Sequence, residues 1–289
     1  MQYLLKNDFY TVTVNEVGAE AVSIKRKDGT ELLWHAPDGS GWQMQAPFLF
    51  PICSRLKDKT YFCDGKPYQM DLHGFLKDTP LMLIHHDDTT LHMSLEACEQ
   101  TLAQYPFLWK FDVEYKLSDD KISINVTIEN RDKRELPFMF GWHPGFILPT
   151  SEGQDIEDYE IEFGTDMLGL YGQETRPNAS EYPIPGGSYK ICEKEIYDRD
   201  TLIFGKHHNY ARLFSKGYPY LLEMKWSENM PYYCVWKAPQ HKQKFLCLEP
   251  WSDIPVHKGD GYEQMETKPM TRLPVGEKAT YFMQIRFNN

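Results

Sequence analysis

Alternation of apolar and polar residues with a period of two is the feature of this sequence that most limits its possible folds. The clearest run is KFDVEYKL, in which one face would carry Phe111, Val113, Tyr115 and Leu117. Such alternation is typical of half-buried strands, because successive side chains of a strand point to opposite faces. Further β-rich runs occur near residues 10, 20, 91, 121 and 159 and at the C-terminus.

Turn signals separate these runs. They are KDG at 27–29, PDG at 37–39, CDG at 63–65, SDD at 118–120 and PGG at 185–187. Such tripeptides favour tight reversals of the chain, and no long amphipathic helical pattern competes with the strand pattern. We therefore predict an all-β fold, built as a large antiparallel β-sandwich.

The length of 289 residues does not require a second domain, because all-β units reach this size. The stretch GLYGQETRPNASEYPIPGGS, residues 169–188, is rich in Gly, Pro and polar residues. The composition is similar on both sides of it, so we interpret it as a long surface loop rather than a linker. Residues 1–289 are expected to form a single domain.

Charge and hydropathy exclude several classes of partner. The net charge is -11 and no basic block occurs, which argues against nucleic-acid binding. The N-terminal segment turns polar after five residues, and no window approaches the ~20 apolar residues of a membrane span. We expect a cytoplasmic protein with no membrane partner.

The six widely spaced cysteines, without any CxxC, are expected to be reduced and buried and to form no zinc site.

Three segments interrupt the alternation with polar groups in aromatic and proline-rich surroundings. The first, residues 46–78, places Arg55 directly after the apolar run PFLFPIC and His73 within DLHGF. A guanidinium that follows a buried strand needs a partner, because an unpaired buried charge is costly. This partner is either an internal carboxylate or a bound ligand.

The second segment is LPFMFGWHPGFILP, in which His143 is flanked by Gly141 and Gly145. These glycines allow another group to approach the backbone closely. His143 is then either a hydrogen-bonded core residue or a catalytic residue.

The third segment, KFLCLEPWSDIP, has Glu249 directly after an apolar run and before Pro250. We expect Glu249 to leave a buried strand and to enter a loop. Partial desolvation would raise the pKa of this carboxyl and make it a usable base. The alternative is that Glu249 pairs with one of the arginines.

The motifs SRL, DLHGF, GWHPGF and CLEPW occur in this order along most of the chain, and together they resemble the aldose 1-epimerase (galactose mutarotase-like) family, closest to its LacX-like branch. The resemblance implies a β-supersandwich with an open cleft. It implies an isomerase that interconverts the α and β anomers of a small aldose, needs no cofactor or metal, and is a monomer or homodimer.

Residue roles follow from the resemblance position by position. Glu249 matches the general base, His143 the general acid and His73 the second active-site histidine. Arg55 matches the arginine that holds sugar hydroxyls, and the sugar-binding aspartate falls within IYDRDTLIF. Asp200 fits this aspartate better than Asp198, although a shift of two positions would reverse the choice.

The sugar contacts are less well defined than the acid and the base. Trp251 is expected to lie against the sugar. The histidine motif continues as GWHPGFILP, whereas better-studied members continue with an aromatic residue and an asparagine, so the identity of the sugar stays open.

The expected chemistry needs only one acid and one base, because a proton leaves the anomeric hydroxyl while another reaches the ring oxygen. Three alternatives remain. A hexose 6-phosphate epimerase would need extra cations, for which Arg55, Lys57 and Lys77 are the available residues. A non-catalytic sugar-binding protein would keep the cleft alone. A glycoside hydrolase would use two carboxylates, such as Asp200 and Glu249.

Overall fold

The computed structural model describes residues 1–288 except 38, 40, 151, 171–181, 206, 207, 216, 217, 239–242, 255–262 and 265–269. Strands dominate the described residues, and the helices are short: α1 (Glu99–Leu102), α2 (Glu193–Arg199) and the 3₁₀ turns η1 (Lys57–Lys59), η2 (Leu76–Asp78), η3 (Ile156–Asp158) and η5 (Pro185–Gly187). The predicted all-β class is confirmed. In the described part, no helix is long and apolar enough to cross a membrane.

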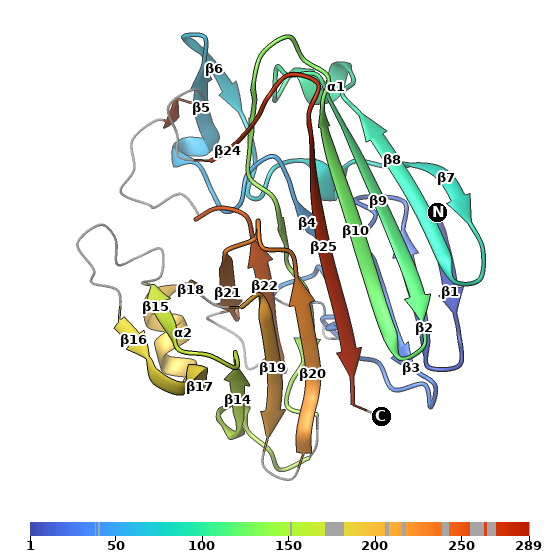
Figure 1. The fold of residues 1–289 in the computed structure, drawn as a ribbon, viewed down its shortest axis with the longest axis vertical. Coiled ribbons are helices and arrows are strands. Elements are labelled where there is room, and N and C mark those ends of the chain that lie inside the picture. The colour runs from blue at the N-terminus through green and yellow to red at the C-terminus, as the bar shows by residue number, and fades with distance from the viewer. Residues whose placement is uncertain are drawn as a thin grey trace.

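The larger layer is an antiparallel sheet of nine strands, most of which run side by side in Figure 1. Its strands, in spatial order, are β17 (Ser188–Lys190), β14 (Tyr159–Glu162), β19 (Tyr210–Ser215), β20 (Tyr218–Trp226), β25 (Lys278–Phe287), β10 (Lys121–Asn130), β9 (Trp109–Ser118), β8 (Thr90–Glu96) and β7 (Met82–His86).

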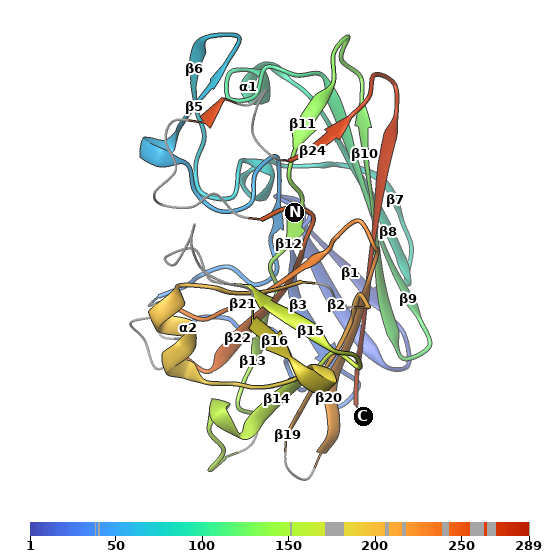
Figure 2. The same ribbon diagram turned by 60° about the vertical axis from the view of Figure 1, so that its left-hand side comes forward.

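The second layer, seen beside the first in Figure 2, is also antiparallel. Its strands are β16 (Tyr182–Ile184), β15 (Met167–Leu170), β18 (Leu202–Gly205), β21 (Tyr232–Trp236), β22 (Phe245–Trp251), β12 (Gly141–Trp142) and β4 (Phe48–Leu49), with β13 (Gly145–Ile147) also paired to β22. Because β22 has neighbours on both edges, its residues are held firmly in place.

Three small sheets complete the described fold. The first consists of β1 (Gln2–Lys6), β2 (Tyr10–Asn15) and β3 (Ala21–Arg26). The second pairs β11 (Leu136–Phe138) with β24 (Thr271–Leu273), and the third contains β23 (Glu263–Gln264), β5 (Thr60–Cys63) and β6 (Lys66–Gln69). β23 and β5 run parallel, unlike the other paired strands.

The main apolar core follows the predicted alternation. On β9, the side chains at 111, 113, 115 and 117 are all buried in it. Strand β22 is buried on both faces: Leu246 and Leu248 join the main core, whereas Phe245, Cys247 and Trp251 belong to smaller clusters on the opposite face. Glu249 shares the latter face, because it is an even number of residues from all three.

Several local predictions can now be compared with the structure. The turn at 63–65 joins β5 to β6, and the turn at 118–120 joins β9 to β10. The prediction of one loop over 169–188 is wrong at both ends, because these ends contribute to β15, β16 and β17. Residues 171–181 of this stretch lie outside the described residues. Position 38 of the predicted PDG turn also lies outside them. Four of the six cysteines are buried, as expected, whereas Cys192 is partly exposed and Cys98 is exposed.

Candidate active site

A cavity of about 180 Å³ opens on the face of β22 that carries Glu249. Its wall includes all six residues selected from the sequence as catalytic or substrate-binding: Arg55, His73, His143, Asp200, Glu249 and Trp251. They come from segments up to almost two hundred residues apart. The fold thus brings together the polar groups that interrupt the strand pattern.

Glu249 lies inside strand β22, opposite Cys234 of β21. The expectation that it leaves the strand for a loop is wrong, because Pro250 and Trp251 continue the same strand. The side chain is fully buried, and this burial raises the pKa of the carboxyl well above its usual value; the Trp251 indole opposes the effect to a smaller extent. A carboxyl in this position has a high affinity for a proton.

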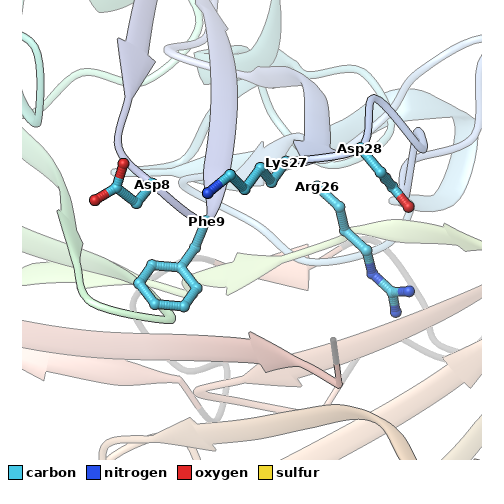
Figure 3. Close-up of a pocket in the computed structure, with 5 residues that line it drawn as sticks. All are labelled: Asp8, Phe9, Arg26, Lys27 and Asp28. Atoms are coloured by element: carbon cyan, nitrogen blue, oxygen red, sulfur yellow. The ribbon is translucent and has the colours of Figure 1, made fainter.

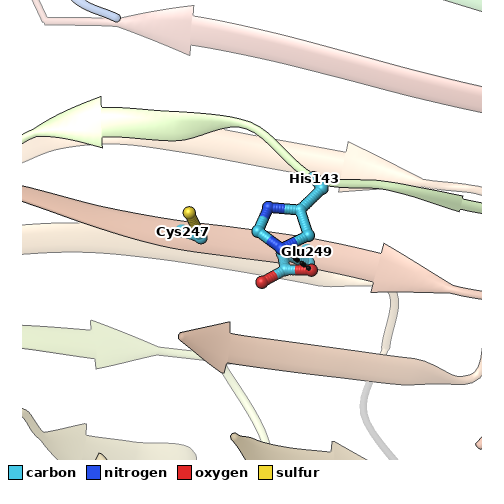
Figure 4. Close-up of side chains that lie close together, drawn as sticks. All are labelled: His143, Cys247 and Glu249. Carbon is cyan, nitrogen blue, oxygen red and sulfur yellow. Dashed lines mark ion pairs between the residues drawn. The ribbon is translucent and has the colours of Figure 1, made fainter. Parts of the chain in front are cut away.

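His143 lies between β12 and β13, and its imidazole contacts Glu249 (Figure 4). The distance from His143 Nε2 to Glu249 Oε2 is 3.3 Å. The backbone N–H of His143 donates to the carbonyl of Pro47, which fixes the chain at this point. Burial lowers the pKa of the imidazole to about 3. Among the described residues, the side chain that pairs with the Glu249 carboxyl is therefore this histidine and not an arginine.

Buried polar atoms of this pair lack hydrogen-bond partners within the described part of the chain. They are His143 Nδ1 and both carboxylate oxygens of Glu249. Buried polar atoms are nearly always hydrogen-bonded, so a cluster of unsatisfied ones facing a cavity indicates a site that binds a polar ligand.

The two glycines beside His143 admit aromatic rings to the site. A Cβ atom on Gly145 would lie 2.3 Å from the Trp42 ring, and one on Gly141 would lie 2.7 Å from the Trp251 ring. Both distances are far shorter than a normal carbon–carbon contact of about 3.5–4.0 Å. The close approach expected from the sequence is therefore made by tryptophan side chains.

His73 lies beside the pair and has a defined tautomer. Its Nδ1 accepts a hydrogen bond of 2.9 Å from the backbone N–H of Ser54, so the proton of the neutral ring is on Nε2. Burial, followed by the charge of His143, lowers the pKa of His73 well below its usual value. The ring centroids of His73 and His143 are 5.3 Å apart. His73 is therefore a neutral hydrogen-bond donor at neutral pH.

Arg55 and Asp200 lie at the rim of the cavity as an ion pair, with 3.4 Å between Nη2 and Oδ2. Asp200 directly follows helix α2 and has a positive φ of 64°, so the end of the helix directs it. Asp198 instead pairs with Lys194 on the exposed surface of α2. Of the two candidate aspartates, Asp200 is the one that lines the cavity. Its partner Arg55 is exposed, so the expectation of a buried guanidinium after the apolar run is wrong.

The family model for aldose 1-epimerase matches residues 1–286. The chain belongs to the aldose 1-epimerase family. Protein LacX of Lactococcus lactis is 28% identical over 284 residues, covering 92% of each chain. Membership of this family assigns the chain to the isomerases.

Solved structures extend the comparison at the level of the fold. A galactose mutarotase related enzyme from Lactobacillus acidophilus superposes with a TM-score of 0.88 at 24% identity, covering 100% of this chain and 98% of that one. A galactose 1-epimerase from the same organism gives a TM-score of 0.69 at 14% identity, covering 99% and 93%. The predicted galactose mutarotase-like supersandwich is confirmed.

Two further aromatic residues lie in the site and were not predicted from the sequence. The rings of Trp42 and Trp236 lie 5.3 Å and 5.5 Å from the imidazole of His143. Trp42 precedes the first motif, and Trp236 lies on β21 beside β22. Neither belongs to a recognisable motif, so only the folded chain reveals them. Together they form an apolar wall next to His143 and Glu249.

A larger hollow of about 470 Å³ lies elsewhere, beside the end of β3 (Figure 3). Its described lining consists of Asp8, Phe9, Arg26, Lys27 and Asp28. None of these side chains is fully buried, and none is a histidine. This hollow therefore has no counterpart of the buried carboxyl–imidazole pair.

Proposed function

We propose that this chain interconverts the α and β anomers of an unphosphorylated aldohexose, with Glu249 as the base and His143 as the acid. The observation that carries the proposal is the 3.3 Å contact between these two buried side chains in the wall of a cavity. The solved galactose 1-epimerase of the same fold supports an aldohexose as the substrate.

The reaction follows from this geometry. The Glu249 carboxylate removes the proton from the anomeric O1 hydroxyl, while the imidazolium of His143 gives its proton to the ring oxygen O5. The C1–O5 bond breaks, and its electron pair stays on O5 while O1 forms the aldehyde double bond. Rotation about C1–C2 and reversal of both proton transfers closes the other anomer. Since O1 and O5 are bonded to the same carbon, an acid and a base only a few ångströms apart can serve both.

The other cavity residues have complementary binding roles in this proposal. The Nε2–H of His73 and the guanidinium of Arg55 donate hydrogen bonds to sugar oxygens, and Asp200 accepts them from hydroxyls. Trp251, Trp42 and Trp236 offer ring surfaces to the apolar C–H face of the sugar. The pocket would thus contact both the hydroxyl groups and the apolar C–H face of a pyranose.

Glu249→Gln tests the proposal, because it removes the base and keeps the shape of the side chain. We expect loss of α/β interconversion in polarimetry, by roughly 10²- to 10⁴-fold, with sugar binding retained in calorimetry. Glu20→Gln is the matched control, since Glu20 is also buried but does not line the cavity. Near-normal interconversion by Glu249→Gln would reject the assignment.

His143→Asn should lower kcat similarly. A change in KM alone would indicate that His143 has only a binding role.

The charges at the cavity favour a neutral sugar over a sugar phosphate. In the described lining of the cavity, two cations occur, and each already contacts a carboxylate: Arg55 pairs with Asp200, and Lys77 with the adjacent Asp78. A phosphate would have to compete with both. Comparing kcat/KM on glucose or galactose with that on the 6-phosphates decides between the two substrates, and preference for a phosphate would overturn this part of the proposal.

A further inference from the structure

We propose that His143, Cys247 and Glu249 also form a binding site for one thiophilic divalent cation such as Zn²⁺ or Cd²⁺, and that the bound cation inhibits the enzyme. The binding part is independent of the proposed function. The inhibition part rests on Glu249 and His143 being the base and the acid.

The three side chains lie close together on the second sheet (Figure 4). Cys247 precedes Glu249 by two residues on β22 and therefore points to the same face. One ligand atom from each of the three residues lies within 4.8 Å of the others, and all three residues are buried. Among the described residues, no other such group of three His, Cys, Asp or Glu side chains occurs.

The donor set is one that zinc prefers. Imidazole nitrogen, thiolate sulfur and carboxylate oxygen bind Zn²⁺ at about 2.0–2.3 Å, which places ligand atoms of a tetrahedral site roughly 3.5 Å apart. His143 Nε2 and Glu249 Oε2, at 3.3 Å, already have this separation. The Cys247 sulfur lies within 4.8 Å of the other two ligand atoms, so it must move by at most about 1.3 Å to reach the separation of a tetrahedral site.

The unsatisfied atoms of the site provide independent support. Both oxygens of Glu249 are buried and have no hydrogen-bond partner in the described structure. A cation bound there would satisfy this carboxylate. The Cys247 thiol and the Glu249 carboxyl each release a proton to solvent as their bonds to the metal form. The complex of one dication, one thiolate, one carboxylate and a neutral imidazole carries no net charge, which suits a buried site.

Inhibition follows from the shared ligands. His143 and Glu249 line the cavity, whereas Cys247 lies behind them among apolar side chains. A cation therefore enters by the same opening as the sugar. Once bound, it occupies the lone pairs through which the imidazole and the carboxylate exchange protons, so sugar and cation compete. Cys247 takes no part in the proton transfers, which allows cation binding to be removed without removing catalysis.

Titration of the metal-free protein with Cd²⁺ tests the site directly. We expect the ultraviolet absorption band of a cadmium–thiolate bond to saturate at one cation per chain. The band should be lost in Cys247→Ala and kept in Cys98→Ala, an exposed thiol, and in Cys234→Ala, a buried thiol outside the cluster. Competition with a coloured chelator should show that Cys247→Ala weakens Cd²⁺ affinity by more than roughly 100-fold. A band that persists in Cys247→Ala would overturn the proposed site.

Polarimetry tests the inhibition. We expect Cd²⁺ to inhibit the wild type and the two control variants, excess sugar to relieve the inhibition, and Cys247→Ala to remain active and resistant. Inhibition of Cys247→Ala at the wild-type Cd²⁺ concentration would overturn the proposal. If the alanine variant does not fold, Cys247→Ser replaces it in the affinity and inhibition assays. If the wild type shows the cadmium band but no epimerase activity, the metal site stands and the proposed function fails.

Discussion

Gly145→Ala should disable the active site by moving a tryptophan rather than by removing a functional group. The added Cβ would lie 2.3 Å from Cζ3 of Trp42. A normal contact is about 3.5–4.0 Å, so the ring must retreat by at least about 1.2 Å. Because no positive φ occurs at Gly145, alanine introduces no backbone strain, and the clash is the dominant effect.

The size of the effect follows from what Trp42 contacts. Its ring stacks on Phe245 at 5.2 Å and lies against His143 at 5.3 Å between centroids. Overpacking of this kind costs about 1–3 kcal/mol of folding stability. A displacement of about 1 Å in a site that positions reacting groups can lower the rate by roughly 10²-fold. We therefore expect a loss of ten- to hundredfold in kcat/KM by polarimetry, together with an earlier urea unfolding transition.

A second substitution tests whether the clash with Trp42 causes the effect of Gly145→Ala. Trp42→Leu removes the atoms that Gly145→Ala would strike, so the double variant should regain the stability lost in Gly145→Ala. The two effects should be strongly non-additive, as is usual for residues in contact. If the double variant is destabilised by the sum of the single effects, the contact between positions 42 and 145 is not the reason for the glycine. Full activity of Gly145→Ala would refute the argument directly.

Three further predictions concern ionisable groups. The pKa of His73 is lowered in the folded state, so the unfolded chain binds the proton more readily. The free energy of unfolding should therefore fall as the pH decreases below about 6.5. In urea denaturation, His73→Gln should weaken this pH dependence. Asp200→Asn should raise KM by roughly tenfold through a weaker charge-assisted hydrogen bond, whereas Asp198→Asn on the surface should leave KM unchanged. Because Glu249 and His143 must together hold one proton, kcat/KM should be bell-shaped in pH; a monotonic profile would contradict a shared proton.

The sequence predicted the fold class well because strand alternation is a local property. Residues 111–117 show it within a single strand, and the structure buries the expected face of β9. The short helix α2 was not predicted, because seven residues give no clear helical period. It nevertheless determines the position of Asp200, which follows its last residue.

The site was predictable only in part, and for a physical reason. Motifs of several residues identified six of the polar and aromatic positions that line the cavity. The sequence could not show that Glu249 stays within its strand, because a proline usually marks the end of one. It also could not show that Trp42 and Trp236 lie against His143, since these contacts join segments that carry no common pattern.

Burial has opposite effects on the pKa values of the proposed base and acid, and this explains why a bound sugar matters for their reactivity. It raises the pKa of Glu249 and lowers that of His143, so both groups are favoured in their neutral forms. Without a ligand, the shared proton therefore belongs on the carboxyl group, whereas catalysis begins with it on the imidazole. A sugar brings hydroxyl groups that can hydrogen-bond to both, and these bonds reduce the cost of charge in the cavity. Substrate binding thus favours the ion-paired form that ring opening requires, and an empty site rests in the less reactive neutral form.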